Sequence, residues 1–93
     1  MIIHIVTKGY TLLDERGLPH GTVRAIPIGV HISLKKAIEQ INKFDFAAEA
    51  KKHDCDGYSE TVHTSGSRAA VLLDFGRKEC LSKVWVCSRK LEL

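Results

Sequence analysis

The residues best suited to chemistry lie in the segment His53–Gly57, where histidine, aspartate and cysteine follow one another, with His63 a short distance further on. A structural zinc site needs four ligands in a tetrahedron, and sequences usually supply them as two closely spaced pairs. His53 and Cys55 form one such pair, whereas His63 and the other two cysteines do not form a second. We therefore predict that no metal binds here. We expect the segment to end a helix, with His53 at the helix C-terminus, where the dipole favours a cation.

Cysteine and histidine could also act together as a nucleophile and its base. The chain has three cysteines and five histidines, but no nucleophile elbow or family-specific motif surrounds any of them. The glycine-rich loops that bind phosphates are absent, and the carboxylates are scattered. The sequence thus predicts no catalytic residue and no cofactor. Of the three functions that we consider for this protein, a metal- or cysteine-dependent enzyme therefore ranks third.

Positive charge gathers at the C-terminal end of the chain. Residues 1–76 hold nine basic and nine acidic residues, whereas residues 77–93 hold five basic and two acidic ones. Lys83, Trp85 and Arg89 share one face of an expected strand, because side chains two residues apart point the same way. An aromatic ring between two cations suits nucleic acid. The second-ranked hypothesis is therefore a nucleic-acid-binding module that uses the basic C-terminal hairpin, with Arg77 and Lys78 in its turn. We favour a core position for Trp85, which is the only tryptophan in the chain.

The function that we rank first is binding to another protein. Phe46 falls outside the apolar stripe of the expected helix when that helix is continued past residue 45. Residues 2–6, except His4, and residues 84–87 are apolar on both faces of their strands, but one helix can cover only one face of a sheet. Another protein, for example a second copy of the chain, would cover the other face. The expected partner-binding residues are Phe46, Lys83, Trp85 and Arg89.

Periodicity and capping residues predict one main helix, which begins after Ser33 and has an apolar stripe wide enough to lie on a sheet. Its other side carries Lys35, Lys36 and Lys43. Asp45 could cap a second short turn that runs to about residue 52.

Alternating apolar residues between turn signals predict the strands. They are expected at residues 2–7, 10–13, 22–28, 58–64, 69–75 and 81–88. Gly9 interrupts the first stretch, and Pro27 places its strand at an edge or a strand end, because proline has no N–H for the ladder. Residues 67–76 could also form a short helix, but the preceding turn favours a hairpin. The predicted fold is α+β, in ββαβββ order, with four to five mostly antiparallel strands and one main helix on one face.

A chain of 93 residues has room for one domain, which we expect to span residues 1–93. Three cysteines without close pairing, Cys55, Cys80 and Cys87, fit reduced thiols in the cytoplasm. No apolar run is long enough to span a membrane, and the apolar start lacks the features of a signal peptide. We expect a small non-enzymatic binding or regulatory protein that docks on another protein. Domains of this kind are frequent among the accessory and inhibitor proteins of phages and mobile elements.

Overall fold

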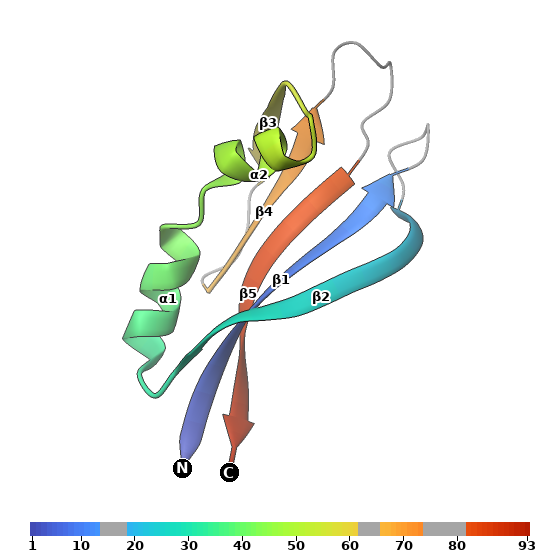
Figure 1. Ribbon diagram of the computed structural model, residues 1–93. Helices are drawn as coiled ribbons and strands as arrows, with labels where there is room; N and C mark the ends of the chain where they lie inside the picture. Colours follow the sequence, from blue (N-terminus) through green and yellow to red (C-terminus); the bar gives the residue numbers. More distant parts are fainter. Residues whose placement is uncertain (14–18, 62–65, 74–81) are drawn as a thin grey trace.

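The computed structural model describes residues 1–13, 19–61, 66–73 and 82–93. The elements are β1 (Ile2–Leu13), β2 (Pro19–His31), α1 (Leu34–Asn42), α2 (Phe46–Lys52), β3 (Gly57–Thr61), β4 (Ser67–Leu73) and β5 (Ser82–Glu92). The strands form one antiparallel sheet in the order β2-β1-β5-β4-β3, and both helices lie on the same face of it (Figure 1). The α+β class and the antiparallel sheet are confirmed.

The order of the elements differs from the predicted ββαβββ arrangement, because two helices rather than one main helix separate β2 from β3. The expected break at Gly9 is also wrong, since β1 runs through this residue. A glycine inside a strand often marks a close approach, and here it leaves room for the side chain of Trp85 on β5. Residues 67–73 form a strand, which agrees with the prediction of a hairpin over a helix. The sequence also indicates turns at residues 14–17, with aspartate first and glycine last, and at residues 76–79, but both lie outside the described residues.

β2 is an edge strand of the sheet, as the position of Pro27 indicates. Gln40 of α1 fills the space that a side chain at Gly29 would need. Its Nε2 donates to the carbonyl oxygen of Ile28 at 3.0 Å, and its Oε1 lies 2.6 Å from Nε2 of His31. These contacts attach α1 to the edge of the sheet.

The core lies between the helices and one face of the sheet. Its buried sheet residues are Val6, Ala70, Leu72, Val84 and Val86. Its buried helix residues are Ala37, Ile41, Phe46 and Ala50. The even-numbered residues of β1, β4 and β5 therefore face the helices, and the odd-numbered ones face the other way.

The helical conformation is interrupted between α1 and α2, and a side-chain cap begins the second helix. Asp45 occupies the N-cap of α2, where its Oδ1 accepts a hydrogen bond from the backbone N–H of Ala48 at 3.1 Å. This confirms the second helical segment that the sequence allowed. Ser33 occupies the N-cap of α1, as predicted, but its side chain makes no capping hydrogen bond.

Arg68 on β4 closes the end of α1. Its Nη1 donates to the carbonyl oxygens of Ile41, Asn42 and Phe44 at 2.9, 2.9 and 3.1 Å. Its Nε and Nη2 donate to the two carboxylate oxygens of Glu60 at 2.7 and 3.1 Å. The hydrogen bond with Glu60 raises the pKa of Arg68, although partial burial opposes the shift. The guanidinium thus donates to carbonyl oxygens at and just beyond the C-terminal end of α1, where helix carbonyls lack an intrahelical partner.

Candidate functional site

The candidate site is the sheet face opposite α1 and α2, which we call the open face. It is formed by the odd-numbered residues of β1, β3, β4 and β5 and by the β2 residues that pair with those of β1. Both helices pack on the other face, and no described segment lies over the open face (Figure 1). Antiparallel sheets often leave one face to water, but that face is then normally polar.

Trp85 lies near the middle of the open face. Its six-membered ring occupies the space next to the Cα atom of Gly9, where any other residue would carry its Cβ. The side chain is half-buried in this position and does not belong to the core cluster. The interpretation of Trp85 as a core residue is therefore wrong, because the core lies on the helix side of β5, against Val84 and Val86.

Lys83 and Arg89 lie on the same strand face, on either side of Trp85 along β5. Lys83 is half-buried and Arg89 is exposed. The alternation predicted from the sequence is thus confirmed for these three residues. Lys90 points to the other face, where it pairs with His4.

Aliphatic side chains fill much of the rest of the open face. Ile5 on β1 pairs with Arg89 on one side and with Val30 of β2 on the other. Val30 is 62% exposed and Leu91 is 44% exposed, which are large values for apolar residues on a sheet. Ile3 on β1 and Val71 on β4 are half-buried on the same face. The described part of the open face is thus mainly apolar.

The charge of the open face has one sign. Its described residues include Lys83 and Arg89 but no aspartate or glutamate. Thr7 and Cys87 add weak polar groups, and Thr7 Oγ1 lies 3.4 Å from Cys87 Sγ. Over the described ranges, the face therefore combines an apolar surface with two cations that have no carboxylate beside them on it.

Phe46 is not part of this face. It is 1% exposed and lies in the core, so the expectation of an exposed aromatic is wrong. Its ring contacts those of Phe44 and Tyr58, and the guanidinium of Arg68 lies 4.9 Å from its centroid. The break at Asp45 rotates α2 relative to α1, which turns this residue inwards.

The residues considered as metal ligands are not brought together. Cys55 Sγ lies 3.6 Å from the carbonyl oxygen of His53, and the side chain of His53 points to Glu49 instead. Within the described ranges, no group of three or more histidine, cysteine, aspartate or glutamate residues could hold a metal ion. His63 and Cys80 lie outside the described residues. His53 does cap the C-terminus of α2, as the sequence indicated.

The sequence missed the Val30 side of the open face, and it missed a small pocket around Glu49 on the other side of the sheet. The lysines of the first helix, Lys35, Lys36 and Lys43, are exposed as predicted. No helix in the described part of the chain is long and apolar enough to cross a membrane. Comparison with models of known protein families, with curated proteins and with solved structures finds no match.

Proposed function

We propose that this chain is a small non-enzymatic binding protein that docks on another protein through the open face. The observation that carries the proposal is an apolar sheet face centred on Trp85 that no described segment covers. Tryptophan and arginine are among the residues that most often dominate binding energy at interfaces, and the open face carries both. We place the protein in the cytoplasm, because three cysteines without close pairing in the sequence fit a compartment that keeps thiols reduced.

The charge of the face favours a different protein over a second copy. Two copies packed face to face would bring Lys83 and Arg89 of each copy together, with no described carboxylate on either face to pair with them. Burying an unpaired charge is costly. We therefore propose a partner with an apolar centre and with aspartate or glutamate residues at the positions facing these two cations.

The test is affinity capture from the native host with the wild type and with a Val30→Glu, Leu91→Glu variant. Both residues are exposed, so these changes should leave the fold intact. We expect the wild type to retain one partner in stoichiometric amount and the variant to lose it. Leu34→Glu is the matched control, because Leu34 is an equally exposed apolar residue on α1. Equal capture by all three proteins would contradict docking through the open face.

Nucleic acid is the second candidate, because Trp85 lies between two cations on an uncovered face. Single-strand binding surfaces usually stack several bases, whereas the described part of this face offers one aromatic ring among aliphatic side chains. With two cations on its described part, the slope of log K against log salt should be about −1.4 to −1.8. Submicromolar binding of an oligonucleotide at physiological salt, abolished by Lys83→Ala with Arg89→Ala, would replace our first choice.

A further inference from the structure

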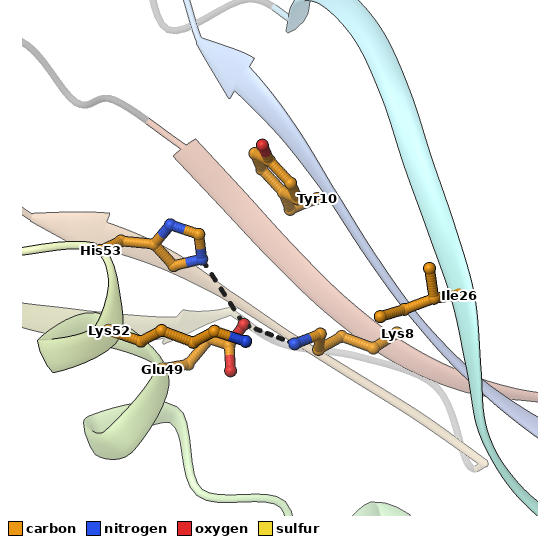
Figure 2. A pocket seen from close by; sticks show the side chains of 6 residues that line it. All are labelled: Lys8, Tyr10, Ile26, Glu49, Lys52 and His53. Atoms are coloured by element: carbon orange, nitrogen blue, oxygen red, sulfur yellow. Dashed lines mark hydrogen bonds and ion pairs between the residues drawn. The ribbon is translucent and has the colours of Figure 1, made fainter.

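A pocket of about 200 Å³ lies on the helix side of the sheet, so it is separate from the open face. It opens between the C-terminal end of α2 and the strands β1 and β2 (Figure 2). Its lining residues are Lys8, Tyr10, Ile26, Glu49, Lys52 and His53.

Glu49 organises the polar side of the pocket. The residue is 8% exposed, and its Oε1 accepts a hydrogen bond from Nζ of Lys8 at 2.8 Å. His53 Nε2 lies 3.5 Å from the same oxygen, one helical turn along α2. Figure 2 shows the carboxylate held between the two groups. A buried ion pair contributes little net stability compared with apolar packing, so its presence beside a pocket is a reason to look for binding.

The charge balance of the pocket is positive. Lys8 and Lys52 carry two ammonium groups against the one carboxylate of Glu49. An ammonium has three N–H donors, and Glu49 engages one of those on Lys8. Donors that remain free to face the pocket favour a ligand with negative charge.

The other side of the pocket is apolar and partly aromatic. The ring of Tyr10 lies 5.4 Å from the ring of His53, with 46° between the two planes. Ile26 on β2 is half exposed and adds an aliphatic side chain. A flat apolar group could therefore pack against Tyr10 and Ile26 while an acidic group reaches the ammonium groups.

We infer that this pocket binds a small organic anion, in which a carboxylate or a phosphate is attached to a flat apolar group. The volume limits the ligand to a small molecule, since pockets for drug-sized ligands measure roughly 300–1,000 Å³. This binding activity goes beyond the proposed docking function and uses the opposite side of the sheet.

The experiment is an NMR titration of the amide signals with four probes. These are phenyl phosphate, benzoate, inorganic phosphate and the uncharged benzyl alcohol. We expect phenyl phosphate or benzoate to shift the signals of Lys8, Tyr10, Lys52 and His53, with a Kd on the order of 1 mM. The stronger of the two identifies the acidic group. The inference is wrong if neither shifts these signals, or if benzyl alcohol binds as tightly as both.

Two neighbouring lysines provide a matched pair of variants. Lys52 lines the pocket, whereas Lys51 is exposed on the same helix and does not line it. Lys52→Ala should weaken binding of the better probe by about fivefold, and Lys51→Ala should not change it. Equal effects of the two changes would show that net charge alone attracts the probe, which would overturn the inference.

The Glu49→Gln variant tests whether the pocket prefers anions or cations. Removing the carboxylate releases Lys8 and makes the pocket more positive, so affinity for the anionic probe should rise at least threefold. A folded Glu49→Gln protein with lower affinity would contradict the inference. The open-face variant Val30→Glu should bind the probe as the wild type does, so this test is independent of the docking proposal.

Discussion

Trp85 and Gly9 determine the centre of the open face as a pair. The two residues are directly opposite in the register of β1 and β5, and the indole occupies the place of a missing Cβ. The ring can therefore lie flat against the sheet, which fixes a large apolar surface at low conformational cost.

Gly9→Ala should displace the indole, because the added Cβ would overlap its six-membered ring. We expect a loss of about 1–2 kcal/mol in the free energy of unfolding, together with a red shift of the fluorescence of the only tryptophan. Urea unfolding followed by fluorescence measures both. Gly57→Ala is the control, because a Cβ there meets no atom within 4 Å, and it should change stability by less than about 0.5 kcal/mol. Equal losses in the two variants would contradict the close packing of Trp85 on Gly9.

The sequence predicted which residues share a strand face but not which face lies in the core. Period-two alternation placed Lys83, Trp85 and Arg89 together, and the structure confirms this. Both alternating sets of β5 are apolar near its centre, so the pattern alone does not say which set the helices cover. The pocket was missed for a related reason: Lys8 and Glu49 are 41 residues apart, and no local pattern joins them. The signal available was Lys8, the only lysine, arginine, aspartate or glutamate in the sequence of β1.

At the scale of the elements, the two helices begin in different ways. Asp45 accepts a hydrogen bond from the first turn of α2, whereas the side chain of Ser33 makes no such bond with α1. Both residues are good N-caps by type, so sequence reasoning treats them as equivalent. The same break explains why Phe46 was misplaced. A helical wheel continued through residue 45 assumes one helix, but α2 starts with a new phase.

Asp45→Ala should destabilise the protein by about 1 kcal/mol, because the N–H of Ala48 loses its partner. Ser33→Ala should change stability by no more than a few tenths of a kcal/mol, because no capping hydrogen bond is lost. Thermal unfolding of the two variants at equal protein concentration measures the difference. The opposite ranking would show that the two caps are assigned wrongly.

Arg68 joins three elements, since it reaches the end of α1, Glu60 on β3 and the ring of Phe46. Arg68→Lys keeps the charge but not the planar set of donors, so it should cost about 2 kcal/mol of stability. Arg89→Lys, at an exposed position, should cost less than about 0.5 kcal/mol. Urea unfolding of both variants is the measurement, and similar losses would argue against the bridging role of Arg68.

The pH dependence of the stabilisation by Arg68 follows from the direction of its pKa shift. The pKa of Arg68 is raised in the folded state, so the stabilisation is fully present below the unfolded value and is lost only as pH rises above it. That window lies far above neutral pH for arginine. The stability difference between the wild type and Arg68→Lys should therefore be constant from about pH 6 to pH 9. A difference that decreases over this range would contradict the shift.

At the scale of the whole molecule, the helices cover one side of a five-stranded sheet, and the other side carries an apolar surface with two cations. The sequence indicated this imbalance correctly. Some of its strands are apolar on both faces, and one layer of helices can cover only one face of a sheet. It did not indicate the kind of partner. That distinction depends on the absence of carboxylates on the described open face, which becomes visible only when the register of all five strands is known.

If the two cations prevent self-association, reversing the charge of one of them should make the open face complementary to a second copy of itself. Lys83 and Arg89 are six residues apart on β5, so two copies packed antiparallel about a twofold axis near residue 86 would place residue 83 of one opposite residue 89 of the other. In the wild type this arrangement puts cation against cation and disfavours association. Arg89→Glu puts Lys83 against a carboxylate at both ends of the apolar surface, so this variant should form dimers of twice the 10.4 kDa chain mass.

Sedimentation equilibrium at micromolar concentration is the measurement. We expect a monomeric wild type, a dimeric Arg89→Glu variant, and a return to monomer when Lys83→Glu is added, because like charges then face each other again. Lys90→Glu is the control, since it makes the same change in net charge at the adjacent residue but on the opposite face of β5. Dimers of Lys90→Glu would show that reduced net charge alone drives association. A wild type that is already a stable dimer would contradict the unpaired cations as a barrier to self-association, and a second copy of the chain would then replace the acidic partner as the occupant of the open face.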